Sequence, residues 1–132
     1  MKRTFFSSLA LIIISVMLAQ ADEADVVSAT IKETAPGVYT ISAAVKHADT
    51  GWDHYADGWD VLGPDGEVIA TRILAHPHVD EQPFTRSQSG IRIPHGISKV
   101  TIRARDSVHG IGGETVTLDV PGAPPAAVPH GS

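Results

Sequence analysis

Apolar and polar residues alternate along most of the chain after position 21, with a period of two rather than the 3.6 of a helix. In residues 38–47, Tyr39, Ile41 and Val45 fall in one phase, while Thr40 and Ser42 fall in the other. This alternation is typical of a strand with one buried face, because successive side chains of a strand point to opposite sides. No segment after residue 21 carries a helical pattern. We therefore predict an all-β domain.

Turn residues divide the pattern into seven short strands. The sequence Gly-Pro-Asp-Gly at 63–66 predicts a tight hairpin turn, because proline presets φ and glycine accepts a positive φ. Short strands at a spacing of about ten residues are typical of an antiparallel sandwich of two sheets. The predicted strands cover residues 25–32, 38–47, 55–62, 67–75, 84–93, 99–106 and 114–120.

The phase of each strand also predicts which side chains face the core. In the first strand Val27, Ala29 and Ile31 share a phase. The whole inward set is expected to include Ile31, Tyr39, Ile41, Val45, Trp59, Val61, Val100, Ile102, Ala104, Val116 and Leu118.

The first 21 residues resemble an export signal rather than part of the fold. Lys2 and Arg3 precede an apolar run over 9–18, and Ala19-Gln20-Ala21 fits a cleavage site of small residues. The run is too short for a bilayer, which needs about 20 apolar residues, so cleavage after Ala21 is favoured over an uncleaved anchor. The chain has no cysteine for lipid attachment. We expect a periplasmic or secreted domain over 22–121, followed by a flexible proline-rich tail over 122–132.

Charge limits the classes of partner. Removing the leader takes the basic residues from 10 to 8 against 15 acidic ones, and the net charge from −5 to about −7. Such a domain is a poor partner for nucleic acid, and it attracts cations. No membrane span is expected once the leader is removed. Both methionines leave with it, so the remaining chain offers no sulfur ligand.

Two features resemble known modules. Trp59 on the third predicted strand, and the stretch from Ile93-Pro94 through Val100 to Ser107, are similar to small exported bacterial immunoglobulin-like or fibronectin type III-like β-sandwich modules. This resemblance implies a seven-stranded antiparallel immunoglobulin-like β-sandwich. Small periplasmic copper carriers are a looser analogue, since they bind metal at one end of such a fold. Their ligands are not carried over, because the expected mature chain begins with Asp22-Glu23 rather than histidine.

The histidines have an uneven distribution. In an alternating strand order, the connections 48–54, 76–83 and 107–113 lie at one end of the molecule. These segments contain or border five of the seven histidines, and the opposite end has one, His95. The five are His47, His54, His76, His78 and His109.

The sequence His76-Pro77-His78 predicts part of a metal site. In an extended segment residues i and i+2 point to the same side, and Pro77 favours that extension. The predicted metal ligands are His54, His76, His78, His109 and Asp80, a set that suits Zn or Cu(II). Other interpretations are a solvated His-X-His pair, a hydrogen-bonded rim position for His47, and an Asx turn formed by Asp106.

The sequence predicts no catalytic residues. Asp106, Ser107 and His109 are too close in the chain to favour a triad, and no GxSxG or HExxH motif occurs. We therefore expect a protein that is not an enzyme. Two functions remain: a divalent-metal-binding protein that uses the histidine cluster, or an envelope interaction module that docks on a partner protein through loops or an edge strand.

Overall fold

The structure, a computed structural model, describes residues 23–122. The predicted leader (1–21) and residues 123–132 of the predicted tail lie outside the described residues. Within the described range there are seven strands and no helix, which confirms the all-β prediction. The strands are β1 (Asp25–Ala35), β2 (Val38–Lys46), β3 (Ala56–Leu62), β4 (Val68–Ile73), β5 (Phe84–Arg92), β6 (Lys99–Asp106) and β7 (Val116–Asp119).

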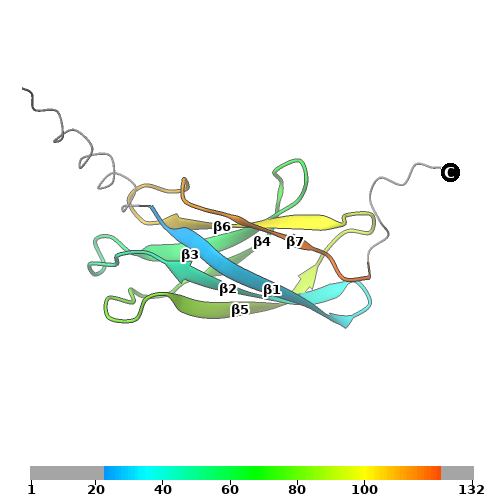
Figure 1. Ribbon diagram of the computed structural model, residues 1–132, viewed down its shortest axis with the longest axis horizontal. Helices are drawn as coiled ribbons and strands as arrows, with labels where there is room; N and C mark the ends of the chain where they lie inside the picture. The colour runs from blue at the N-terminus through cyan, green and yellow to red at the C-terminus, as the bar shows by residue number, and fades with distance from the viewer. Residues whose placement is uncertain (1–22, 123–132) are drawn as a thin grey trace, which may run out of the picture.

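The strands form two antiparallel sheets, with the orders β1-β2-β5 and β4-β3-β6-β7 (Figure 1). The hairpin between β3 and β4 is closed by a bond from the Gly66 N–H to the Gly63 carbonyl, at 3.0 Å. Gly66 has a φ of 84°, a value that a residue with a side chain rarely adopts. The turn is therefore built as its sequence predicts.

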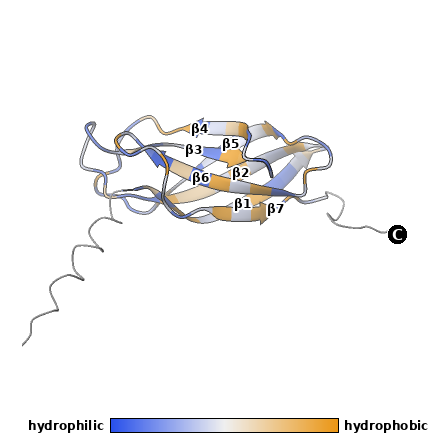
Figure 2. Cartoon of the chain, turned by 90° about the horizontal axis from the view of Figure 1, so that it is seen from above, coloured by the Kyte–Doolittle hydropathy of each residue, from blue (hydrophilic) through white to orange (hydrophobic). Residues whose placement is uncertain are grey.

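The core lies between the two sheets and contains residues from both. Apolar residues recur along the strands of each sheet (Figure 2). Trp59 of β3 and Ile41 of β2 are completely buried, and so is Ile102 of β6. Removing such a side chain costs about 3–5 kcal/mol for tryptophan and about 2–5 kcal/mol for isoleucine. The predicted phases of β2, β3 and β6 are confirmed.

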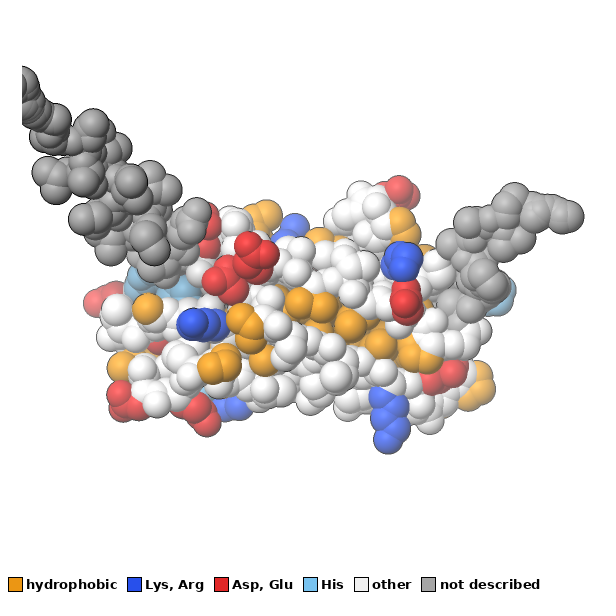
Figure 3. All heavy atoms as spheres, viewed as in Figure 1, with side chains coloured by type: hydrophobic (Ala, Val, Ile, Leu, Met, Phe, Trp, Pro, Cys, Tyr) orange, Lys and Arg blue, Asp and Glu red, His pale blue; other side chains and the backbone are white. Residues whose placement is uncertain are grey.

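The first strand departs from its predicted phase. A β-bulge lies between Val26 and Ser28, so Val26 is buried while Val27 is exposed. The extra residue reverses the inward and outward positions on its N-terminal side. Ile31, Val116 and Leu118 are half-buried rather than buried, because β1 and β7 are the edge strands of their sheets. They pack against the core, and apolar side chains gather in a strip along this side of the molecule (Figure 3).

The strand directions place the three histidine-bearing connections together, as predicted. The β2–β3, β4–β5 and β6–β7 connections all lie at the left end in Figure 1. Hydrogen bonds tie them to one another, and two of these show the pattern. The Ser107 N–H donates to the Tyr55 carbonyl at 2.9 Å, and the His47 N–H donates to the Gln82 side chain at 2.9 Å.

Candidate metal centre

Four polar side chains converge where β2, β3 and β6 meet this end. His47 follows β2 directly and continues the inward phase of Val45, while Asp106 ends β6 in the inward phase of Ala104. His54 precedes β3, and His109 lies in the turn after β6. The alternation that builds the core therefore also turns a histidine and a carboxylate inward at the rim.

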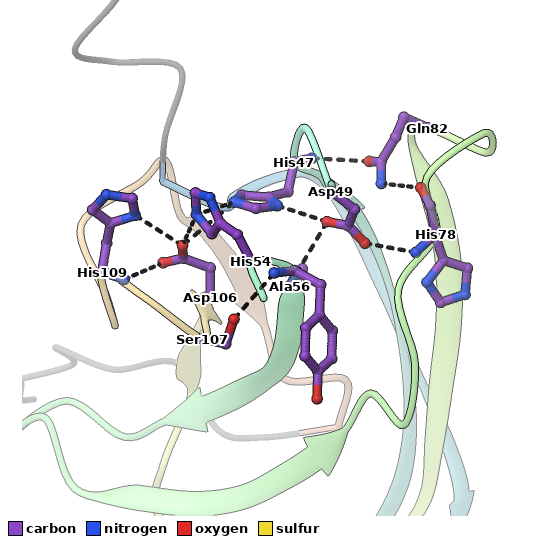
Figure 4. Close-up of polar contacts among 10 residues, drawn as sticks. His47, Asp49, His54, Ala56, His78, Gln82, Asp106, Ser107 and His109 are labelled. Atoms are coloured by element: carbon purple, nitrogen blue, oxygen red, sulfur yellow. Dashed lines mark hydrogen bonds and ion pairs between the residues drawn. The ribbon is translucent and has the colours of Figure 1, made fainter. Parts of the chain in front are cut away.

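Three of these side chains form a compact group (Figure 4). One ligand atom each from His47, His54 and Asp106 lies within 4.8 Å of the other two. The His47 Nε2 is 3.2 Å from the His54 Nε2 and 3.4 Å from the Asp106 Oδ2. The His54 Nε2 lies 2.5 Å from the same Asp106 oxygen. His109 joins at the Asp106 corner, where its Nδ1 is 2.9 Å from Oδ2.

A second buried carboxylate, Asp49, orients His47. The His47 Nδ1–H donates to the Asp49 Oδ1 at 2.6 Å. Asp49 also accepts the backbone N–H of Ala56 at 3.1 Å and that of His78 at 2.6 Å. Because the carboxylate of Asp49 accepts the Nδ1–H, it favours the tautomer of His47 whose Nε2 lone pair points into the group.

Three imidazoles in this group share one carboxylate. The His47 Nε2 faces a carboxylate oxygen of Asp106 and the Nε2 of His54. Burial raises the pKa of Asp106. The hydrogen bonds from the His109 ring, from His54 and from the His109 backbone N–H outweigh that effect and leave the pKa below its usual value. An ionised carboxylate beside imidazole lone pairs is a ready site for a cation.

The group is buried on one side and open on the other. The side chains of His47 and Asp106 are 0% exposed, whereas that of His54 is 21% exposed and that of His109 is 33% exposed. The inner members are fixed by packing and hydrogen bonds, and the outer members border solvent.

The structure divides the predicted ligands into two groups. His54 and His109 lie together, with ring centroids 4.8 Å apart, and they share Asp106. His76 and His78 also lie together, with ring centroids 4.6 Å apart. His78 lies on the other side of His47 and Asp49 from His54 and His109 (Figure 4).

The surroundings of the second pair do not favour a cation. The His78 ring stacks on Phe84 with centroids 3.8 Å apart, and the guanidinium of Arg86 lies 2.8 Å from the His78 Nε2. Burial, followed by the charge of Arg86, lowers the pKa of His78. Asp80 is exposed, and the structure does not bring it into the group of His47, His54 and Asp106.

Two members of the group, His47 and Asp106, are not among the ligands that the sequence predicts. The sequence favours a hydrogen-bonded rim position for His47, which is buried and bonded to Asp49. It favours an Asx turn for Asp106, whose Oδ1 accepts the His109 N–H at 3.1 Å. Both residues in addition belong to the compact group of possible ligand atoms. The sequence does contain a signal for this group. His47 and Asp106 are polar residues in the inward phase at the ends of two predicted strands, and buried polar groups require partners.

Comparison with known proteins gives one sequence relative. No protein-family profile matches the chain. The chain is 36% identical over 109 residues to a protein of Halomicrobium mukohataei named "Putative lipoprotein". The match covers 83% of this chain and 53% of that protein, so the chain spans about half the length of its relative. Within residues 23–122 there is no helix long and apolar enough to cross a membrane.

The fold also aligns with a solved structure, the reduced form of a single-residue variant of a superoxide reductase (neelaredoxin) from Archaeoglobus fulgidus. The alignment has a TM-score of 0.48 and 9% identity, and it covers 87% of this chain and 95% of the other. The sequence-based expectation that the protein is not an enzyme is corrected here, because the aligned protein is an enzyme. At this level of likeness, its activity is not transferred to the chain.

Proposed function

We propose that this chain is an exported β-sandwich that binds one divalent metal ion through His47, His54 and Asp106, with His109 as a fourth ligand. The observation that carries the proposal is the convergence of three ligand atoms within 4.8 Å of one another. Two of them belong to completely buried side chains. Packing and hydrogen bonds therefore hold these two ligand atoms in place before a metal binds.

The distances suit a metal of tetrahedral preference. Bonds of about 2.0–2.1 Å to nitrogen and oxygen give a tetrahedron with edges of about 3.3–3.4 Å. The two distances from the His47 Nε2, 3.2 Å to His54 and 3.4 Å to Asp106, are close to such edges. The distances from Asp106 to His54 and His109, 2.5 and 2.9 Å, are those of hydrogen bonds. For a metal to bind, the His54 Nε2 and the His109 Nδ1 must each give up the proton of that hydrogen bond. Both nitrogens must also move away from Asp106 by less than about 1 Å to reach the tetrahedral distances.

The donor atoms favour Zn(II) or Cu(II). Imidazole nitrogen and carboxylate oxygen without sulfur suit these ions and disfavour Cu(I). The contact between His47 and Asp49 supports the same proposal, because metal-bound histidines usually donate their second ring N–H to a carboxylate or carbonyl.

A metal titration tests this function. The purified protein should bind one Zn(II) or Cu(II) per chain at micromolar concentration or below. His47→Ala should lower the affinity by at least about 100-fold, because it removes a buried ligand. His95→Ala, at the opposite end, is the matched control. Affinity should fall below about pH 6, because protonated imidazole cannot ligate. Equal affinity in His47→Ala and the native protein would reject the site.

The sequence-predicted ligand set of His54, His76, His78, His109 and Asp80 is the alternative site. His76→Ala combined with His78→Ala separates the two sets, since the double variant leaves His47, His54 and Asp106 intact.

Two features of the chain support the exported sandwich. The leader pattern of residues 1–21 is followed by a domain whose relative carries the name of a lipoprotein. The sheet orders β1-β2-β5 and β4-β3-β6-β7 support an immunoglobulin-like arrangement. Mass measurement of the exported protein tests the first point, because cleavage after Ala21 fixes the expected mass.

An interaction module is the second candidate function. Of the seven large apolar residues exposed among the described residues, Trp52, Val79, Val108 and Ile111 lie in the three histidine-bearing connections. Apolar loop tips of this kind favour docking on a partner protein. Absence of metal binding in the titration above would leave this function as the better account.

A further inference from the structure

His109 differs from His47 and Asp106 in its position in the chain and in its exposure. It lies in an exposed turn between β6 and β7, and its side chain is 33% exposed. The next residue, Gly110, has a φ of 74°, which makes this turn dependent on glycine. By contrast, His47 directly follows β2, Asp106 ends β6, and both have completely inaccessible side chains.

The contacts of the His109 ring also set it apart from the compact group of ligand atoms. The compact group of mutually close ligand atoms consists of His47, His54 and Asp106. His109 meets this group at Asp106, through its Nδ1 and its backbone N–H. The backbone contact does not depend on the imidazole, so the turn keeps its bond to Asp106 wherever the ring lies.

We propose that His109 is an exchangeable ligand, and that a small monodentate anion from solvent takes its place on the metal bound by His47, His54 and Asp106. This inference rests on the proposed function. In one state the His109 Nδ1 binds the metal. In the other, the anion binds the metal and the His109 Nδ1–H donates to the Asp106 Oδ2 across the 2.9 Å contact that the structure shows between these two atoms. No electron is transferred, and the exchange shifts one proton between the two nitrogens of the ring.

Charge favours an anion in that position. A divalent ion bound by two neutral imidazoles and one carboxylate keeps a net positive charge of about one. The same two turns carry exposed apolar residues, Val108 and Ile111 in the turn of His109 and Trp52 in the turn of His54.

Azide and Cu(II) test the exchange with a spectroscopic readout. Native protein, His109→Ala, His54→Ala and His76→Ala are each titrated with Cu(II), and the metal-loaded proteins are then titrated with azide. Alanine at 109 keeps the backbone N–H that Asp106 accepts, so the turn should fold as in the native protein. His76→Ala is the matched control, an exposed histidine at the same end of the molecule.

The expected results separate an exchangeable ligand from a fixed one. His109→Ala should bind Cu(II) within about ten-fold of the native affinity, whereas His54→Ala should lose about 100-fold or more. Azide should produce a charge-transfer band at a concentration at least about ten-fold lower in His109→Ala than in native protein, because the competing ring is gone. His76→Ala should behave as native.

Three results would overturn the inference. A loss of copper affinity in His109→Ala as large as that in His54→Ala would make His109 a fixed ligand. An unchanged azide concentration would show that His109 does not occupy the azide position. A lack of any azide band in loaded native and His109→Ala protein would show that no position is open. Failure of the native protein to bind copper is a separate result, and it would reject the proposed function as well.

Discussion

Two aspartates of the four-stranded sheet, Asp60 of β3 and Asp106 of β6, have completely buried side chains, and they differ in their partners. Asp60 accepts bonds from Arg105 and from Arg103, the latter with its Nη2 at 2.9 Å from Oδ2, and from the Thr71 hydroxyl at 2.8 Å. Asp106 is surrounded by three imidazoles. One carboxylate is paired with permanent cations, and the other with weak bases.

This difference separates a structural ion pair from a candidate binding site. Arginine stays charged at any pH that a folded protein tolerates, so Asp60 is compensated by the chain itself. Imidazole can release its proton and bind a metal ion instead, so the group around Asp106, unlike that around Asp60, can exchange protons for a cation. A buried carboxylate that lacks a permanent cation is therefore the more informative of the two about function.

Of the two aspartates, Asp60 is expected to have the larger effect on stability. Asp60→Asn keeps the shape of the side chain but leaves two arginines without a charged partner, and it should lower the free energy of unfolding by about 2–3 kcal/mol. Both arginine side chains are partly exposed, which limits the loss. Urea denaturation measures the change, and metal affinity should stay the same. A loss of metal affinity in this variant would mean that the two carboxylates are coupled.

A smaller effect, on metal affinity, is expected at Asp49. Asp49→Asn no longer favours the His47 tautomer with a proton on Nδ1, and it should lower the affinity about 10- to 100-fold without removing a ligand. Calorimetric titration with Zn(II) measures the change. Asp53→Asn, an exposed carboxylate in the same connection, is the control. Unchanged affinity in Asp49→Asn would show that packing alone orients His47.

Acid should gradually remove the stabilisation due to Asp60. Burial raises the pKa of Asp60, but the bonds from Arg105, Thr71 and Arg103 together hold the pKa below its ordinary value. A carboxyl with a lowered pKa stabilises the fold above its unfolded-state pKa of about 3.9, and the stabilisation is lost as the pH falls through the folded-state pKa. The gap in unfolding free energy between native protein and Asp60→Asn should be full at pH 7 and shrink below about pH 4. A gap that stays constant down to pH 2 would contradict this account.

The smallest effect is expected from the second histidine pair. His76→Ala combined with His78→Ala should change Zn(II) affinity by less than about three-fold, because Arg86 already occupies the His78 Nε2 and no ligand of the proposed site is lost. The same titration measures it. Abolished binding would favour the ligand set predicted from the sequence.

The sequence predicted the location of the site better than the residues that form it. Strand alternation and turn residues placed His54 and His109 at one end, and that placement depends only on strand direction. The choice of ligands depends on register, which brings Asp106 opposite Ala56 across β3 and β6. A β-bulge between Ala56 and Gly58 lies beside that pair, and no local pattern in the sequence marks it.

The burial of Asp60 was also hidden from the sequence. Asp60 lies in the outward phase of β3, opposite Arg103 of β6 and Thr71 of β4. Arg103 and Arg105 alternate with the inward residues of β6, and this pattern alone favours a solvated face because a single strand does not show what lies across from it. Side chains from three strands close over this carboxylate, and only the pairing of the strands brings them together.

The most direct test of the metal centre is a Zn(II) titration of native protein, Asp106→Asn and Asp60→Asn, with thermal unfolding followed in parallel. The account predicts one ion per chain for native protein and for Asp60→Asn, each with a metal-dependent rise in melting temperature. It predicts that Asp106→Asn loses at least about 100-fold in affinity and shows no such rise. Native protein that binds no metal at micromolar concentration, or Asp106→Asn that binds as tightly as native protein, would contradict the account.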